Sequence, residues 1–331
     1  MKINILFPFK AGPYGGGNQF LKALRKYFIQ NAVYSEHVEN ADVILFNSHH
    51  KLSKLIEFKR KYPKKIFIHR IDGPVFLIRK DNMILDKLIY SINEKIADAS
   101  IFQSKWSKQK NQELGIKSNT FETIILNAPN PEIFNTTGKT PFYPKGKIKI
   151  IATSWASNKN KGFETYKFLD ENLDFSKYEM TFCGNTPVAF KNIKHIKALP
   201  SKKLADVLKK HDIYITASKN DPCSNSLIEA MHCGLPAIGF HDGGHPEIIG
   251  SGGLTFKNNE QIFELLKKIE KNYNHFQNNI NLPDMDKTGA LYFNFIQKVY
   301  SDIKETKKLN LNNLLILQKN ILIHKITKYF K

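Results

Sequence analysis

The chain has 331 residues, enough for two domains of about 150 residues each, and its 41% hydrophobic and 12% aromatic content excludes a disordered polyelectrolyte. The net charge of +20 favours polyanionic partners, namely nucleic acid, an anionic membrane surface or phosphorylated substrates, although dispersed lysines are also typical of a plain solvated surface. Three cysteines without C-x-x-C spacing argue against a disulfide framework and a zinc site, and no apolar run suits a signal peptide or a membrane span.

The first 127 residues alternate short, apolar, β-branched runs with segments of helical period. Residues 18–30 are a predicted helix, and the predicted strands are 3–9, 41–47, 65–69, 99–103 and 123–127. Strands that alternate with helices indicate βαβ units and a parallel sheet.

Residues 128–147 then gather four prolines and two glycines, a composition typical of an interdomain linker. Beyond them the alternation restarts, with predicted strands at 148–155, 178–184, 212–218 and 235–240, and predicted helices at 162–173, 201–211, 226–234, 258–274 and 288–305. We therefore predict an α/β protein with two facing, doubly wound Rossmann-like domains and an interdomain cleft, where ligands lie at the carboxyl ends of strands. The predicted boundaries are 1–130, 131–286 and, for the C-terminal helices, 287–331.

Two segments of the first half follow strands directly. The glycines Gly15, Gly16 and Gly17 open the first helix, where they allow close approach to an anion, although a tight turn would also use glycine. The motif is neither G-x-G-x-x-G nor a P-loop. In "FIHRIDGP", His69 would transfer a proton or orient a hydroxyl and Arg70 would meet a phosphate; alternatively, Asp72 caps a surface turn.

The second half offers two further candidates. Lys159 and Lys161 stand before a glycine and a helix start, where ammonium groups and free N–H groups favour a diphosphate. Asp221 lies in a loop after a strand, and the helix start at Ser224, Asn225 and Ser226 directs amides toward phosphate or sugar oxygens. Glu229 either accepts hydrogen bonds from vicinal hydroxyls or closes a capping box with Ser226 on its own helix.

The stretch "DPCSNSLIEAMHCGLPAIGFHDGGHPEII" resembles the signature of the family-four retaining glycosyltransferases, also called glycosyl transferases group 1. Weaker matches are the "GPYGGGNQ" loop, "SKWS", "NAPNPEIF" and the Lys161-Gly162 pair. The resemblance implies the GT-B fold. It also implies that Glu229 binds the donor ribose, that Asp221 contacts the transferred sugar, and that Lys161 neutralises the diphosphate opposite Gly15–Gly17. The chain departs from the family in having Asp221 where Glu is usual and no Arg shortly before Lys161.

The resemblance further implies a retaining, metal-independent hexosyltransferase that moves a sugar from a UDP- or GDP-sugar to a glycan or lipid-linked acceptor in surface polysaccharide biosynthesis. Catalytic roles are predicted for His69, Asp72 and Asp221, without cofactor or metal. A nucleotide-sugar epimerase or a phosphorylase would use the same fold. The hypothesis of a nucleic-acid-binding module does not explain the signature in residues 219–249. We expect a cytoplasmic protein whose tail, residues 311–331, either packs back on the domains or lies on the anionic inner face of the membrane.

Overall fold

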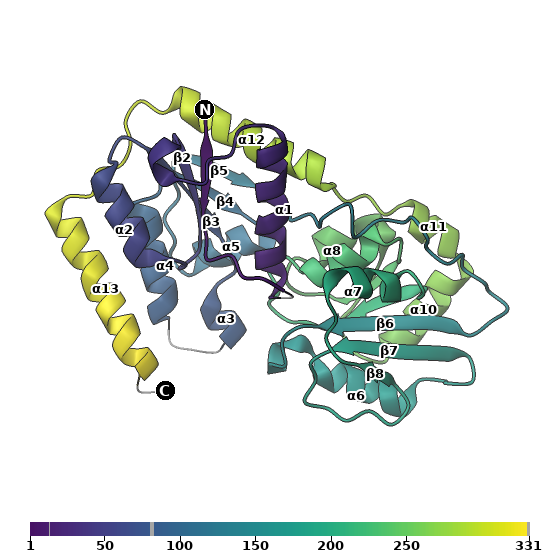
Figure 1. Ribbon diagram of the computed structural model, residues 1–331. Coiled ribbons are helices and arrows are strands. Elements are labelled where there is room, and N and C mark those ends of the chain that lie inside the picture. The colour runs from purple at the N-terminus through teal and green to yellow at the C-terminus, as the bar shows by residue number, and fades with distance from the viewer. Residues whose placement is uncertain (13, 80–82, 330–331) are drawn as a thin grey trace. The chain divides into compact units, whose positions relative to one another are not determined.

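The computed structural model describes residues 1–12, 14–79 and 83–329, so residues 330 and 331 of the predicted tail lie outside the described residues. The chain divides into two compact units (Figure 1). Unit 1 contains Met1–Phe9, Leu24–Leu126 and Asp286–Lys331, and unit 2 contains Lys10–Ala23 and Asn127–Met285. Each unit has its own parallel β-sheet covered by helices.

The sheet of unit 1 has the order β1-β2-β3-β4-β5, and all of its strand pairs are parallel. Its strands are β1 (Ile3–Leu6), β2 (Val43–Asn47), β3 (Ile66–Ile71), β4 (Ala99–Phe102) and β5 (Phe121–Ile124). The helices that end in this unit are α1 (Gly16–Gln30), α2 (Leu52–Lys61), α3 (Val75–Arg79), α4 (Ile84–Lys95), α5 (Lys105–Glu113), α12 (Met285–Asp302) and α13 (Leu311–Tyr329).

The chain passes along both edges of β1. After α1 it pairs through Tyr34 with Ile3, along the edge of β1 that β2 does not occupy, and then crosses to β2. Strand β2 is buried along its whole length, as expected for a parallel strand covered on both faces. Ile44 and Phe46 share one core with helices α2 and α4, and Leu317 of α13 joins it; α13 lies beside α4 in Figure 1.

The C-terminal segment is fastened to unit 1 by a buried carboxylate. Asp98 accepts hydrogen bonds from the backbone N–H groups of Phe67 at 2.8 Å and Lys307 at 2.7 Å, and its carboxylate lies 3.4 Å from the ammonium of Lys59. The Lys307 ammonium donates in turn to the carbonyl of Glu94 at 2.9 Å. These contacts tie the segment between α12 and α13 to strands β3 and β4.

Unit 2 has a six-stranded parallel sheet in the order β11-β10-β9-β6-β7-β8. Its strands are β6 (Ile148–Ser154), β7 (Tyr178–Gly184), β8 (Lys194–Ile196), β9 (Ile213–Thr216), β10 (Ala237–Phe240) and β11 (Gly253–Phe256). Its helices are α6 (Phe163–Asn172), α7 (Ser201–Leu208), α8 (Asn225–His232), α9 (His245–Ile249), α10 (Gln261–Lys271) and α11 (Tyr273–Asn278). The chain builds outward from β6 to β8 and then returns to β9 on the other side of β6.

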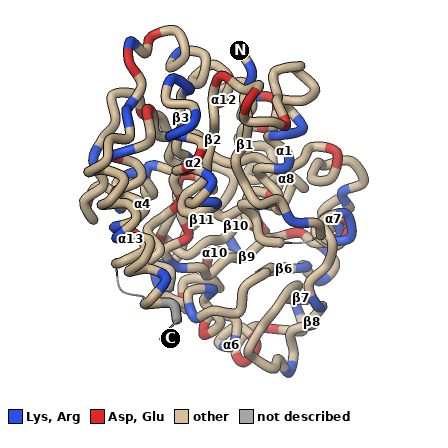
Figure 2. Tube along the Cα trace, turned by 60° about the vertical axis from the view of Figure 1, so that its left-hand side comes forward, with Lys and Arg blue, Asp and Glu red and all other residues tan. Residues whose placement is uncertain are grey.

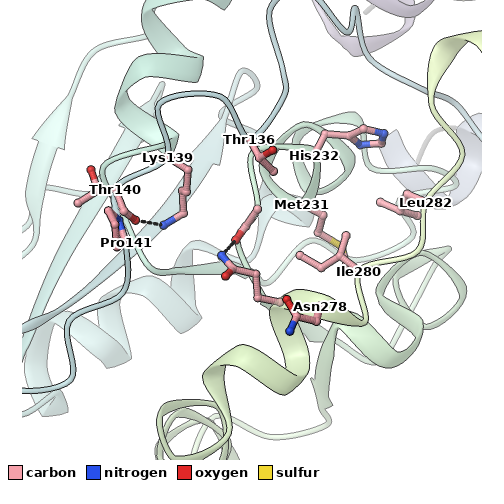
Figure 3. Close-up of a pocket in the computed structure, with 11 residues that line it drawn as sticks. Thr136, Lys139, Thr140, Pro141, Met231, His232, Asn278, Ile280 and Leu282 are labelled. Atoms are coloured by element: carbon pink, nitrogen blue, oxygen red, sulfur yellow. Dashed lines mark hydrogen bonds between the residues drawn. The ribbon is translucent and has the colours of Figure 1, made fainter.

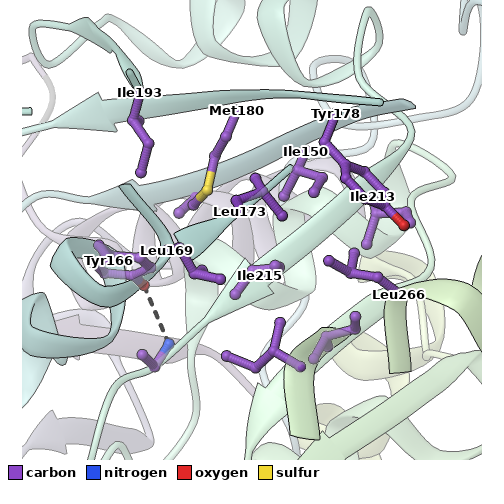
Figure 4. Close-up of a cluster of buried hydrophobic side chains, with 14 of the residues drawn as sticks. Ile150, Tyr166, Leu169, Leu173, Tyr178, Met180, Ile193, Ile213, Ile215 and Leu266 are labelled. Atoms are coloured by element: carbon purple, nitrogen blue, oxygen red, sulfur yellow. Dashed lines mark hydrogen bonds between the residues drawn. The ribbon is translucent and has the colours of Figure 1, made fainter. Parts of the chain in front are cut away.

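The core of unit 2 lies between this sheet and its helices. Figure 4 shows Ile150, Met180 and Ile213 pointing from strands β6, β7 and β9 toward Leu169 of α6 and Leu266 of α10, and all five side chains are at most 2% exposed. The predicted α/β class with two parallel, Rossmann-like sheets is confirmed. Strands β8 and β11 were not predicted from the sequence, and β1 ends at Leu6, before the predicted end at residue 9.

Lysine and arginine residues are spread over both units (Figure 2). Within the described part of the chain, no helix combines the length and the apolar character that crossing a membrane requires. Helix α13 nevertheless exposes several large apolar side chains, among them Leu311, Leu315, Leu322 and Ile326.

Candidate functional site

The switch point of the unit 2 sheet lies between β6 and β9, where neighbouring strands have their connections on opposite faces. Lys161 follows β6 in a single turn of 3₁₀-helix (Lys159–Lys161), and Asp221 follows β9. The Lys161 ammonium lies 3.0 Å from the Asp221 carboxylate. Two residues that are sixty positions apart are thus paired at the edge of the sheet where open α/β folds bind ligands.

Gly162 explains why these two loops come so close. Its φ of +72° is in the left-handed region, and a Cβ there would lie 2.2 Å from the carbonyl oxygen of Ala217. Backbone therefore packs directly on backbone. The N–H of Lys219 also donates to the carbonyl of Asn160 at 2.7 Å, which joins the loops on either side of the Lys161–Asp221 pair.

A third loop, after β10, holds the backbone of Asp221. The N–H of Gly244 donates to the Asp221 carbonyl at 2.9 Å, and a Cβ on Gly243 would lie 2.3 Å from the same oxygen. Burial of Asp221 raises the pKa of its carboxyl, but the charges of Lys161 and His245 outweigh burial and leave that pKa below its usual value. Asp221 is therefore an ionised carboxylate near neutral pH.

Helix α8 begins at Asn225 with Ser224 as its N-cap, and the Ser224 side chain makes no capping hydrogen bond. Ser226 lies inside the helix, so the capping box that the spacing of Ser226 and Glu229 allowed is absent. Within the described residues, the Glu229 carboxyl makes no hydrogen bond or ion pair, and burial alone raises its pKa to about 8. Glu229 is thus a partly buried acid without a partner, next to a helix start whose N–H groups lack side-chain acceptors.

His245 is a further residue of this cluster, and sequence reasoning did not single it out. Its side chain is fully buried, and Nδ1 lies 3.0 Å from the carbonyl of Phe240, so Nδ1 carries the proton that is donated there. Nε2 is buried without a hydrogen-bond partner among the described residues. Burial lowers the pKa of His245, whereas the charge of Asp221 opposes this shift. The only sequence signal was its place between "GG" and Pro246.

The glycine loop before α1 belongs to unit 2 and reaches the start of α8. A Cβ on Gly16 would lie 2.4 Å from Nδ2 of Asn225, so only glycine fits against this side chain. Gly15 has a φ of +42°, and a Cβ on Gly17 would meet no atom within 4 Å. The Asn225 amide oxygen accepts a hydrogen bond from Asn127 at 3.2 Å. The backbone of Gly16 and the side chain of Asn225 are therefore in direct contact.

Lys159 and three residues of unit 1 complete the predicted set. Lys159 is exposed on the short helix that carries Lys161. His69 belongs to unit 1, where its ring is fully buried and stacks on Phe46 at 4.5 Å between centroids. Its two nitrogens lie 3.1 Å from the Asn93 side chain and 3.2 Å from the Ser48 carbonyl, and burial lowers the pKa of His69 to about 4. A catalytic role for His69 stays a prediction.

Arg70 is likewise buried in unit 1. Its guanidinium donates to Oη of Tyr292 at 3.1 Å and to the Asp72 carboxylate at 3.1 Å, and it also bonds the side chain of Asn47. Donor binding by Arg70 and catalysis by Asp72 also stay predictions. Among the described residues, no group of three or more His, Cys, Asp or Glu side chains is arranged to hold a metal ion.

Comparison with known proteins gives the chain's relatives. Residues 189–281 match the family described as glycosyl transferases group 1. A probable sucrose-phosphate synthase of Thermosipho melanesiensis is 28% identical over 137 residues, 39% of this chain, and the match spans about a third (32%) of that relative's length.

Solved structures resemble nearly the whole chain, among them the following two. Sucrose-phosphate synthase from Thermosynechococcus elongatus is 12% identical with a TM-score of 0.64, over 98% of this chain and 100% of that one. HepE of Anabaena, in complex with UDP-glucose, is 12% identical with a TM-score of 0.62, over 91% of this chain and 98% of that one.

The two Rossmann-like units and these structural likenesses define an α/β protein of the GT-B fold. The resemblance carried by residues 219–249 is confirmed, because they lie within the segment, residues 189–281, that matches the family described as glycosyl transferases group 1.

Proposed function

We propose that this protein is a glycosyltransferase that takes its sugar from a nucleoside-diphosphate sugar bound at the switch point of unit 2. The observation that carries the proposal is the partly buried, unpartnered Glu229, which lies on the same loop–helix segment as Asp221, the ion-pair partner of Lys161. A carboxyl group that has no partner in the free protein is suited to accept hydrogen bonds from the two ribose hydroxyls. The family match and the UDP-glucose bound to HepE support the same donor class.

Each residue of the cluster then has a task. Lys161 would place its ammonium against the diphosphate, and the free N–H groups at the start of α8 would add hydrogen bonds to phosphate or sugar oxygens. Asp221 holds Lys161 in the free protein and would accept hydroxyls of the transferred sugar. Asn225 and Gly16 would bound the site on one side, since a side chain on Gly16 would fill the space beside Asn225.

We further propose that transfer retains the anomeric configuration and needs no divalent metal, because Lys161 and helix N–H groups are suited to stabilise charge on the leaving diphosphate. The test is transfer with UDP-glucose and GDP-mannose in EDTA, with product anomers assigned by NMR. Full activity in EDTA and a retained anomer are expected. Activity that returns only with added Mg²⁺ or Mn²⁺, or an inverted product, contradicts this part.

The acceptor is proposed to be a glycan or a lipid-linked sugar used for surface polysaccharide, made at the cytoplasmic face of the membrane. Support comes from α13, where Leu311 is 71% exposed, Leu315 55% and Leu322 57%, and where Lys319 and Lys325 are interspersed. Such a helix suits an anionic lipid surface. Co-sedimentation with vesicles containing anionic lipid, but not with purely zwitterionic vesicles, is expected; equal binding to both or to neither contradicts it.

The donor assignment is tested by calorimetry with UDP, GDP, ADP and CMP, followed by Glu229→Ala. One nucleoside diphosphate should bind selectively, and Glu229→Ala should abolish its binding and sugar transfer. The central assignment is wrong if Glu229→Ala leaves both intact. Release of free, epimerised sugar without an acceptor would point instead to an epimerase on the same fold.

A further inference from the structure

Unit 2 contains a pocket that is distinct from the switch point. It has a volume of about 510 Å³ and is formed by residues 136–141, by the end of α8 with the turn that follows it, and by residues 277–282 (Figure 3). All of these residues belong to unit 2. The pocket is therefore built within one compact body of the chain.

The pocket lies at the opposite end of α8 from the candidate donor site. Met231 and His232 line it from the last turn of the helix, whereas Ser224 and Asn225 stand at the first turn. The turn after α8 leads into the amino end of β10, so the pocket is at the edge of the sheet opposite to the carboxyl ends that carry Lys161 and Asp221. A molecule bound here would not compete with a donor at the switch point.

Lys139 gives the pocket a positive charge. Its ammonium donates a hydrogen bond to the carbonyl of Thr140 at 2.9 Å, and it forms no ion pair with any described carboxylate. Burial lowers the pKa of Lys139, although the charge of Asp212 opposes this shift. A half-buried ammonium without a carboxylate in direct contact is a group to which a phosphate can bind.

The remaining walls combine hydrogen-bonding and apolar groups. The side-chain nitrogen of Gln277 donates to the carbonyl of Gly234 at 2.7 Å, which fixes the amide, while its oxygen accepts no hydrogen bond from the described residues. In Figure 3, Thr136 and Lys139 stand on one side, and Met231 and Ile280 on the other. Hydroxyl and amide groups suit the hydroxyls of a sugar, and the apolar side suits its C–H face.

We propose that this pocket binds a small sugar phosphate, with the phosphate on Lys139 and the sugar hydroxyls near Gln277 and Thr136. The pocket's chemistry requires both parts of the ligand. An ammonium alone would take any anion, whereas the fixed amide and the apolar wall select a polyol with one C–H face. The proposal is independent of the proposed function, because it uses no residue of the switch point.

The experiment measures binding of glucose 6-phosphate to the full chain by calorimetry, with glucose as the neutral control. Binding is expected for the phosphate ester only. Lys139→Met should weaken it by at least about tenfold, since a charge-assisted hydrogen bond is lost in a partly buried site. Lys145→Met is the matched control: Lys145 is exposed six residues further on, and its loss should leave the affinity within about twofold.

The location of binding is read from methionine methyl NMR. The chain has five methionines, which makes assignment by single substitutions practical. Glucose 6-phosphate should shift the methyl signal of Met231 and leave that of Met180, in the core of the sheet, unchanged. The same shift should appear when UDP is present at saturation. The proposal is overturned if wild-type protein does not bind glucose 6-phosphate, if Lys139→Met binds it as well as wild type does, or if UDP displaces it.

Discussion

The partly buried carboxyl of Glu229 predicts an unusual dependence of stability on pH. The pKa of a glutamate side chain is 4.5 in the unfolded chain, and that of Glu229 is about 8 in the folded chain. Between pH 4.5 and pH 8 the folded state therefore holds a proton that the unfolded chain has released. The free energy of unfolding therefore falls as pH rises through this window. At pH 7 the loss attributable to Glu229 amounts to about 3 kcal/mol, because each pKa unit corresponds to about 1.4 kcal/mol.

Glu229→Gln keeps the shape of the side chain and removes the titration. We expect the variant to match wild type at pH 4, below both pKa values, and to be more stable by up to about 3 kcal/mol at pH 7. Glu179→Gln is the control, because Glu179 is an exposed carboxylate on β7 of the same unit and should change little.

The assay is urea unfolding from pH 4 to pH 8, followed by tryptophan fluorescence. The chain has two tryptophans, and a Trp106→Phe background leaves Trp155 as the reporter for unit 2. If the stability difference between Glu229→Gln and wild type is the same at pH 4 and pH 7, burial does not hold the carboxyl protonated. The reasoning about the unpartnered acid would then be refuted.

Three further outcomes follow from the contacts described above. Lys161→Met should weaken binding of the nucleoside diphosphate by at least about tenfold in calorimetry, and it should leave the partly buried Asp221 carboxylate without its ion pair. An unchanged affinity would show that Lys161 does not belong to the donor site. Gly162→Ala should lower the urea midpoint by much more than Gly138→Ala, because both glycines have positive φ but only at Gly162 would a Cβ strike backbone; equal losses would mean that strain alone matters. Tyr292→Phe should destabilise unit 1 by about 1–3 kcal/mol in thermal unfolding, since Arg70 loses a buried acceptor, and an unchanged Tm would contradict this role.

The sequence was informative wherever a local pattern determines the structure. Buried parallel strands are continuous apolar runs, so strand β7 was predicted with the bounds that the structure has, residues 178–184. The edge strand β8, "KHI", is short and exposed, and nothing in its pattern separates it from a loop. The glycine-rich junctions were recognised because glycine alone allows a positive φ and a close approach of two backbone segments, as at Gly162 and Gly243.

The pairing of side chains could not be predicted in the same way. The spacing of Ser226 and Glu229 fits a capping box, but the helix starts earlier, and burial of the carboxyl depends on how distant parts of the chain pack around it. Sequence also does not reveal that His245 is buried beside Asp221, or that Arg70 bonds Tyr292, because those contacts join elements that are far apart along the chain.

Unit 1 is made from both ends of the chain, and this has a consequence for synthesis. A ribosome completes all of unit 2 before it delivers Lys307, whose N–H meets the buried Asp98. Until then Asp98 and Lys59 lack their covering segment, and α4 lacks α13. The sheet of unit 1 therefore stays incompletely covered while the ribosome synthesises unit 2. A chain that stops after residue 285 would leave unit 1 permanently in that unfinished state.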